Sequence, residues 1–384
     1  MSGSRGRRRS RAARRGVLVV AASVVVAVGA VTGMINALDD ERGVNTARPD
    51  ATGATLLVPL PDTPSISASP KASASATPTK TVAPSPTKTG KARPAAVSPR
   101  LYRHPESQVL DWVRDHPDDP RTEVIASRIA DQPAAVWFAD FTPSTITSRV
   151  RAVTSGAAAQ GRVPVVVPYA IPDRDCGGAS EGGASDFDAY DGWIDNFAAG
   201  LGSREVVVVL EPDSIAQADC LSDAQRADRF EALARAGRVL KAADPKARVY
   251  YDAGHSDWNP AAQQAALLKQ AGAASADSSD GIFSNVSNFH ATSAEIAYDR
   301  QVLDALGGPA GLGAVIDTSR NGNGAPADGQ WCDPAGRKIG QAPTLNTGEA
   351  RIDGYLWVKL PGESDGCKGA AGTFTASYAY ELAR

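Results

Sequence analysis

The chain has 384 residues, of which 42% are hydrophobic, and its formal net charge is −3. Seven arginines and no acidic residue lie within residues 1–15, so the rest of the chain has 33 basic and 43 acidic residues. An acidic body excludes a nucleic-acid-binding protein, which would carry a basic face. Four scattered histidines and four cysteines without C-x-x-C spacing argue against a zinc site, and no metal or other cofactor is expected.

Residues 16–38 are almost wholly apolar and directly follow the arginines of residues 1–15. A basic stretch before an apolar segment is typical of an export signal. This 23-residue segment is also long enough to span a bilayer core of about 30 Å. No clean A-x-A cleavage site follows, so a signal peptide and a transmembrane anchor both stay open. In either case residues 1–15 form a cytoplasmic segment, and we expect a protein that is secreted or held at the extracellular face of the plasma membrane.

Residues 39–98 are expected to be a disordered linker, and the Pro/Ser/Thr-rich composition is clearest over residues 63–98. No Phe, Trp or Tyr occurs before Tyr102. Because a segment without aromatic residues cannot easily build a packed core, we place the globular domain at residues 99–384.

The globular part alternates between short β-branched or aromatic runs and longer helical stretches such as residues 221–243. Apolar strands that alternate with helices predict a parallel sheet covered on both faces. Seven such units suit an α/β fold of the β/α-barrel type better than an open doubly wound sheet. The predicted strands are residues 134–140, 163–170, 206–213, 247–254, 281–289, 313–320 and 353–361.

Nearly every predicted strand ends in polar or aromatic residues that a core does not use. In a β/α barrel the carboxyl ends of the strands converge on one face, where active sites are built. Many carboxylates there, without metal ligands, point to acid/base chemistry. The residues concerned are Tyr169 and Asp175, Glu211 and Asp213, Asp252 and His255, Asn285 and Asn288, Asp317 and Arg320, and Lys359 and Glu363.

Several segments resemble the motifs of glycoside hydrolase family 6, the inverting cellulases, and they follow the order of that family over residues 100–384. The resemblance implies a distorted seven-stranded parallel barrel that hydrolyses β-1,4-glucosidic bonds with inversion, in the manner of an actinobacterial endoglucanase. The segments are V-P-Y-A-I-P-D-R-D-C (167–176), V-V-V-L-E-P-D-S-I-A (207–216), Y-Y-D-A-G-H-S-D-W (250–258), V-I-D-T-S-R-N-G-N-G (315–324), W-C-D-P (331–334) and W-V-K-L-P-G-E-S-D-G-C (357–367).

Glycoside hydrolysis needs a carboxylic acid that is protonated at the working pH. Asp213, which follows the most apolar strand, matches the family's general acid; alone it could be a helix N-cap. The resemblance makes Asp175 the aspartate that keeps this acid protonated and orients water, and Asp365 the base that activates water. A turn aspartate remains the alternative for Asp365. Asp252 resembles a further aspartate that tunes the site, and Tyr169 the tyrosine packed against the distorted sugar.

Apolar sugar faces bind on aromatic platforms, and three tryptophans in the matching motifs are expected at strand ends. Lys359 and Glu363 resemble ligands of the sugar on the non-reducing side. The resemblance also pairs the four cysteines, each disulfide closing an active-site loop. The predicted substrate-binding residues are Trp137, His255, Trp258, Asn288, Trp331, Lys359 and Glu363, and the predicted disulfides are Cys176–Cys220 and Cys332–Cys367.

The sequence thus predicts a monomeric endo-β-1,4-glucanase. Only six residues separate Asp213 from Cys220, and such short intervals favour an open cleft. The alternatives are an exo-acting cellobiohydrolase of the same family, whose longer loops would roof the cleft, and a non-hydrolytic glucan-binding protein. A non-hydrolytic protein would be expected to have lost one of the aspartates, and none is missing.

Overall fold

The computed structural model describes residues 100–384. The predicted segments 1–15, 16–38 and 39–98 lie outside the described residues. Within residues 100–384, no helix combines the length and the apolar character that crossing a membrane requires.

All seven predicted strands are present, and they form one sheet in the order β1 to β7 with every neighbouring pair parallel. Valine-rich runs such as residues 206–209 suit strands because β-branched side chains are stiff at χ1 and pack well on a pleated surface. The strands are β1 (Val136–Phe138), β2 (Val165–Pro168), β3 (Val206–Leu210), β4 (Ala247–Asp252), β5 (Gly281–Ser284), β6 (Gly313–Asp317) and β7 (Ile352–Leu356).

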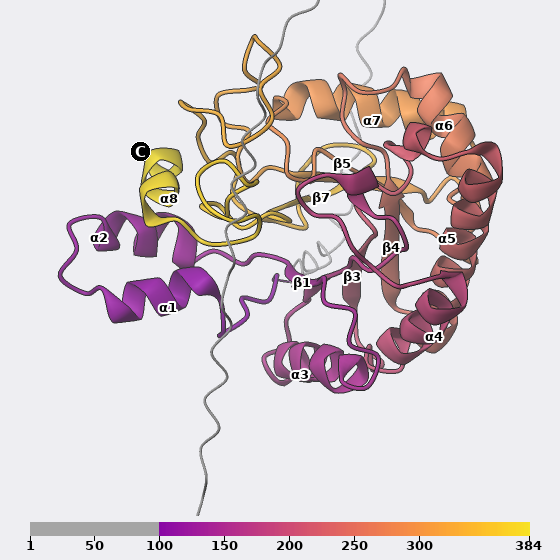
Figure 1. Cartoon of the computed structure of the whole chain (residues 1–384), viewed down its shortest axis with the longest axis horizontal. Helices are drawn as coiled ribbons and strands as arrows, with labels where there is room; N and C mark the ends of the chain where they lie inside the picture. Colours follow the sequence, from indigo (N-terminus) through magenta and orange to yellow (C-terminus); the bar gives the residue numbers. More distant parts are fainter. Residues whose placement is uncertain (1–99) are drawn as a thin grey trace, which may run out of the picture. The chain divides into compact units, whose positions relative to one another are not determined.

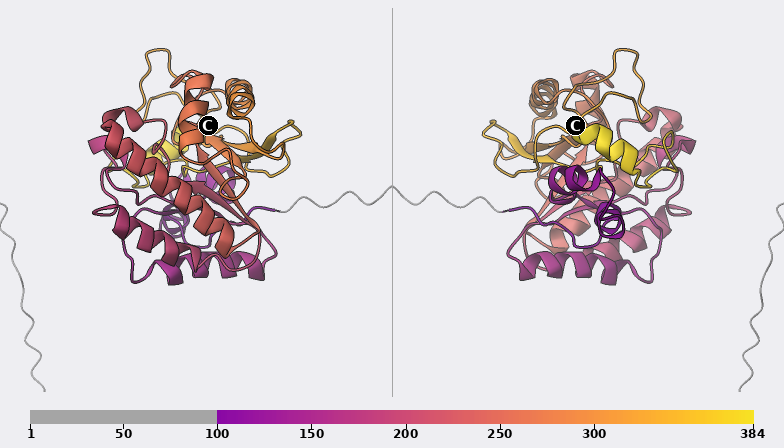
Figure 2. Two further views of the ribbon diagram at one scale, coloured as in Figure 1. Left: turned by 90° about the vertical axis from the view of Figure 1, so that its right-hand side faces the viewer. Right: turned by 90° about the vertical axis from the view of Figure 1, so that its left-hand side faces the viewer.

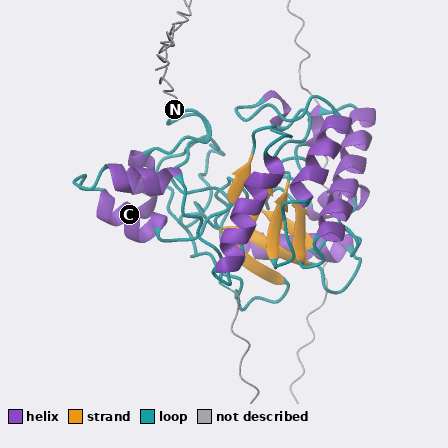
Figure 3. Ribbon diagram, turned by 90° about the horizontal axis from the view of Figure 1, so that it is seen from below, coloured by secondary structure: helices purple, strands orange, loops and turns teal. Residues whose placement is uncertain are grey.

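Successive residues of each strand pack on opposite faces of the sheet. In β3, Val207 and Val209 join an inner apolar cluster, whereas Val206 and Val208 pack in the cluster that includes the helices. Figure 3 shows helices beside the sheet, with loops gathered at its edge. Because both faces are buried, the strands have no polar alternation.

The sheet curls so that its two edge strands approach each other. The backbone N–H of Ala135 donates to the carbonyl of Trp357 at 2.9 Å, and the indole N–H of Trp137 donates to the carbonyl of Val358 at 2.7 Å. Among the described residues, no strand ladder joins β1 to β7. The predicted barrel is therefore present as a curled half-barrel of seven parallel strands.

The helices form two groups. Helices α3 to α7 follow the strands and cover the sheet from outside, as the views from two sides show (Figures 1 and 2). The predicted helix over residues 221–243 is α5, and it begins with a capping box between Ser222 and Gln225. The helices are α1 (Gln108–Asp115), α2 (Thr122–Ile125), the π-helix η1 (Ala126–Ala130), α3 (Ile146–Ala159), α4 (Phe187–Ala198), α5 (Asp223–Ala243), α6 (Ala261–Gln270), α7 (Thr292–Leu306) and α8 (Ala376–Ala383), with 3₁₀ turns η2 (Asp175–Gly177) and η3 (Ala218–Cys220).

The second group brings the two ends of the domain together. Helices α1 and α2 lie beside α8, although they come from opposite ends of the described chain (Figure 1). Val109 of α1, Ile125 of α2 and Ala379 of α8 share an apolar cluster with Trp357 and Leu360, which follow β7. This layer supports the segment after β7, from which several predicted site residues extend.

Candidate active site

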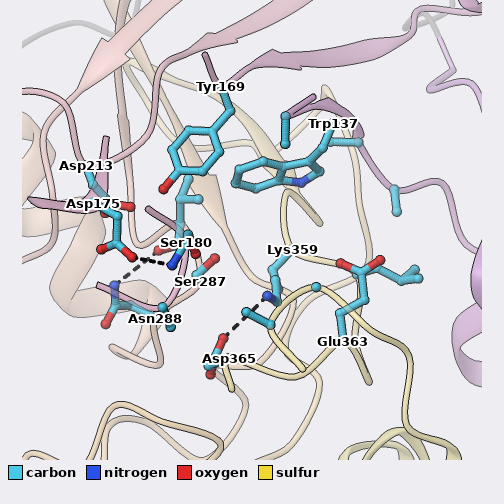
Figure 4. Close-up of a pocket in the computed structure, with 18 of the residues that line it drawn as sticks. Trp137, Tyr169, Asp175, Ser180, Asp213, Ser287, Asn288, Lys359, Glu363 and Asp365 are labelled. Carbon is cyan, nitrogen blue, oxygen red and sulfur yellow. Dashed lines mark hydrogen bonds and ion pairs between the residues drawn. The ribbon is translucent and has the colours of Figure 1, made fainter. Parts of the chain in front are cut away.

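A cleft with a volume of about 1230 Å³ lies among the loops that follow the strands. Eleven of the twelve predicted catalytic and substrate-binding residues line it; Asp252 does not. Figure 4 shows Asp213 and Asp175 on one side of this pocket and Asp365 beside Lys359 on another. The eleven are Trp137, Tyr169, Asp175, Asp213, His255, Trp258, Asn288, Trp331, Lys359, Glu363 and Asp365.

Three cleft residues after different strands have a left-handed backbone. The φ angles are 57° at Asp175, 68° at Asp213 and 59° at Ser287. A side-chain-bearing residue in this region costs about 1–3 kcal/mol and persists only where the surroundings fix it. The fold therefore stabilises these loop positions against local backbone preference, as is usual for functional sites.

Asp213 has the environment of a proton donor. Its pKa is raised to about 8, first by burial and then by the negative charges of Asp252 and Asp175. Lys359 and a hydrogen bond from Tyr169 act in the opposite direction. A carboxyl with such a pKa is protonated at neutral pH, because burial and nearby anions disfavour its charged form.

Asp252 lies beneath the cleft and acts through the loop that carries Asp213. Its Oδ2 accepts from the backbone N–H groups of Ile215 at 3.0 Å and Ala216 at 2.8 Å, and its Oδ1 accepts from Gly254 at 3.0 Å. Only 2% of this residue is exposed. Asp252 therefore fixes the turn after Asp213 and places a buried negative charge behind it.

Asp175 is held by its own loop. Its Oδ2 accepts from the backbone N–H of Ser180 at 2.7 Å, and an added Cβ on Gly178 would lie 2.5 Å from the same oxygen. The neighbouring Cys176 forms the predicted disulfide with Cys220, which ties this loop to the loop after β3. The carboxylate thus has a fixed direction, and Gly178 is required to let it pass.

Asp365 belongs to a cluster of buried charges. Its Oδ2 accepts from Arg320 Nη1 at 2.7 Å, and its Oδ1 lies 3.5 Å from Lys359 Nζ. Cys367, two residues after Asp365, forms the second predicted disulfide with Cys332. Asp365 therefore lies between two cations at the side of the cleft.

Aromatic rings form one wall of the cleft. Trp137 and Tyr169 meet edge to face with ring centroids 5.3 Å apart, and the Arg174 guanidinium lies 4.6 Å above the Tyr169 ring. Burial raises the pKa of the Tyr169 hydroxyl well above its usual value. This hydroxyl therefore remains protonated and able to donate a hydrogen bond into the cleft.

Glu363 extends from the segment after β7. Its pKa is raised to about 7 by burial, against the opposing charges of Lys359 and Arg320. Gln108 of α1 donates to Glu363 Oε1 at 3.2 Å and to the carbonyl of Gly372 at 2.8 Å. The α1–α8 layer therefore positions a carboxyl that titrates near neutral pH.

Two of the three predicted tryptophan platforms differ from the expected strand-end placement. Trp137 lies inside β1 rather than at its end, and Trp331 lies in the long connection between β6 and β7 with 61% of its surface exposed. Trp258 follows β4 as expected, 5.2 Å from the ring of His255.

His255 also stacks on His290 at 4.1 Å, and burial lowers the pKa of His255 to about 3. The His255 imidazole is therefore neutral at neutral pH.

Sequence reasoning missed three residues that support the site: Gln108, Ser180 and Asp333. Ser180 acts through its backbone N–H, which leaves no sequence signal. Asp333 lies in the W-C-D-P motif, which marked the segment without assigning the aspartate a role. Within residues 100–384, no group of three or more His, Cys, Asp or Glu side chains is arranged to hold a metal ion.

Comparisons with known proteins agree on one family. The family described as Glycosyl hydrolases family 6 matches residues 93–383. "Endoglucanase 1" of Streptomyces sp. (strain KSM-9) is 52% identical over 334 residues, covering 86% of this chain and 91% of that protein. "Endoglucanase A" of Thermobispora bispora is 48% identical over 284 residues, covering 74% of this chain and 61% of that protein. The solved structure of the endoglucanase Cel6 from Mycobacterium tuberculosis, in complex with methyl-cellobiosyl-4-deoxy-4-thio-β-D-cellobioside, is 40% identical with a TM-score of 0.69 and covers 75% of this chain and 97% of that one.

Proposed function

The chain belongs to glycosyl hydrolases family 6, and we propose that it hydrolyses β-1,4-glucans within the polymer and inverts the anomeric configuration. The observation that carries the proposal is Asp213, a carboxyl with a pKa of about 8 that lines a cleft together with the carboxylates of Asp175 and Asp365. An acid protonated at neutral pH beside two other carboxylates is what glycoside hydrolysis requires. The relatives named endoglucanase support internal cleavage.

Asp213 acts as the general acid. As the glycosidic bond lengthens, its proton passes to the leaving oxygen, and the sugar develops oxocarbenium character. Asp175 and Asp252 keep the proton on Asp213 until that step through their negative charges. The Tyr169 hydroxyl hydrogen bonds to Asp213 and faces the distorted sugar.

Water is activated on the opposite face of the sugar. One water attacks the anomeric carbon and its proton passes to Asp365, directly or through a water oriented by Asp175. Proton and charge then balance, because Asp213 loses one proton as the base side gains one. Two carboxyls that act through an intervening water are about 6.5–9.5 Å apart in inverting enzymes.

The cleft walls bind the glucan chain. Trp137, Trp258 and Trp331 stack on the apolar faces of successive sugars. Lys359 and Glu363 hydrogen bond to the sugar on the non-reducing side, and His255 and Asn288 contact hydroxyl groups. The ring of Trp331 is exposed, which suits a binding site at the entrance of the cleft. Such a site binds a continuous polymer rather than a chain end.

Internal cleavage is tested with carboxymethylcellulose. We expect the full-length protein to lower the viscosity of the solution long before reducing ends accumulate, because each cut divides a chain. Accumulation of cellobiose with nearly constant viscosity would instead identify a cellobiohydrolase. Binding without any new reducing ends would identify a non-hydrolytic glucan-binding protein.

We further propose that the protein is a monomer that acts outside the cell, either released or retained at the extracellular face of the membrane through residues 16–38. Two disulfides suit an oxidising compartment. Recovery of all full-length protein in the cytosol after fractionation would contradict the proposed location. A dimer in light scattering would contradict the proposed monomer.

A further inference from the structure

The turn that carries Asp365 converges on one buried carboxylate, that of Asp333. Ser364 Oγ donates to Asp333 Oδ2 at 2.5 Å, and the backbone N–H of Asp365 donates to Oδ1 at 2.8 Å. The N–H groups of Cys367 and Lys368 donate to Oδ2 at 3.0 and 2.8 Å. The Asp333 N–H donates in return to Asp365 Oδ2 at 3.2 Å. The backbone and the side chain of Asp365 are therefore both fixed by Asp333.

Hydrogen bonds stabilise the charged form of Asp333. Its side chain is fully buried, with 0% of the surface exposed. Burial acts to raise its pKa, but the hydrogen bonds from Ser364 and from three backbone N–H groups outweigh burial and hold the pKa below its usual value. A carboxylate that accepts several N–H bonds keeps its charge even away from water.

Asp333 and Asp365 share one cation, the guanidinium of Arg320. Arg320 Nη1 lies 2.7 Å from Asp365 Oδ2 and 3.9 Å from Asp333 Oδ1. Lys359 lies 3.5 Å from Asp365 on the other side. Without Asp333, the charges of Arg320 and Lys359 would act on Asp365 alone, and Asp365 would accept a proton less readily. The other ionisable groups that interact with Asp365 or Arg320 are Glu363, Tyr378 and Asp317.

We propose that Asp333 is a positioning residue for Asp365. It fixes the turn on which Asp365 sits, and by sharing Arg320 it keeps Asp365 basic enough to accept the proton of the attacking water. The inference deepens the proposed function and rests on the proposed role of Asp365 as the base.

The neighbouring disulfide offers a matched control. Cys332 precedes Asp333 in the chain and is bonded to Cys367, whose N–H donates to Asp333. The disulfide and the Asp333 carboxylate thus join the same two segments, but only Asp333 carries a charge. A C332S/C367S variant loosens the junction without changing the electrostatic potential at Asp365.

The test compares Asp333→Asn with C332S/C367S in the full-length protein, through pH profiles of kcat/KM on cellohexaose and thermal unfolding. Both variants should unfold at lower temperature. In Asp333→Asn the freed Arg320 stabilises ionised Asp365, so we expect the acidic limb to move down by about one pH unit. We also expect kcat to fall by up to about tenfold with KM within about twofold, because a weaker base slows only the chemical step. In C332S/C367S the acidic limb should stay at the wild-type pH. If it also stays there in Asp333→Asn, the inference is overturned.

Two more variants keep the test decisive. Asp333→Ser is also neutral and leaves room for water at the four donors, so it replaces Asp333→Asn if that variant does not fold, with the same expected shift. Asp333→Glu retains the charge and should restore the acidic limb even if it does not restore stability. Asp365→Asn distinguishes the proposed function from the further inference. Near-normal hydrolysis by this variant would refute the proposed role of Asp365 as the base. If Asp365→Asn is inactive but the acidic limb of Asp333→Asn does not move, only the role of Asp333 is refuted.

Discussion

Replacing Asp213 with Asn is expected to lower kcat on cellohexaose by about 10²–10⁴-fold, the usual contribution of a general acid. The amide keeps the size of the side chain but has no proton to give to the leaving oxygen. Substrate affinity should change little, because the cleft walls remain. A substrate with a dinitrophenyl leaving group, which departs without protonation, should lose far less activity.

Asp140→Asn is the matched control for Asp213→Asn. Asp140 lines the same cleft, but its side chain is 79% exposed and lies 3.6 Å from Arg149, so the same chemical change should leave hydrolysis intact. The assignment of Asp213 fails if Asp213→Asn cleaves cellohexaose at a rate close to wild type, or if both leaving groups are affected equally.

Replacing Asp252 with Asn is expected to have the second largest effect, on both pH dependence and stability. Asp213 must be protonated to act, so activity falls as the pH rises through its pKa of about 8. The charge of Asp252 helps to raise that pKa, and its removal should move the basic limb of kcat/KM down by about one pH unit. At a pH above both limbs this shift alone removes about nine tenths of the activity.

The amide introduced by Asp252→Asn also fails to accept all three backbone N–H donors that the Asp252 carboxylate accepts. Leaving one buried donor unpaired should lower the free energy of unfolding by about 1–3 kcal/mol, measured in urea. Asp299→Asn is the control: Asp299 is equally buried, but the charges that act on Asp213 are those of Asp252, Asp175 and Lys359. A basic limb that moves equally in both variants would contradict the role of Asp252.

The strands and their order follow from local sequence. Runs such as residues 206–209 are long, β-branched and apolar, and no other structure buries them as well as a parallel sheet covered by helices. The same logic located most of the site, because the ends of parallel strands meet at one edge. Asp175, Asp213 and Lys359 line one cleft for this reason.

Contacts between distant segments could not be predicted in this way. The depth of Asp252 beneath the cleft, the placement of Trp331 far from any strand end and the incomplete closure between β1 and β7 all depend on how long connections fold. The pairing of Gln108 with Glu363 joins residues 255 positions apart. No periodicity or spacing encodes such a contact, because it forms only when α1 packs beside the segment between β7 and α8.

The stereochemistry of hydrolysis tests the central claim most directly. If Asp213 and a separate base act on opposite faces of the sugar, water attacks the anomeric carbon once and the configuration inverts. Proton NMR of a fresh cellohexaose digest should then show α-anomeric reducing ends first, with the β anomer appearing only through mutarotation. A β anomer that appears first, or a trapped glycosyl-enzyme adduct, would contradict the mechanism and require a carboxylate that attacks the sugar directly.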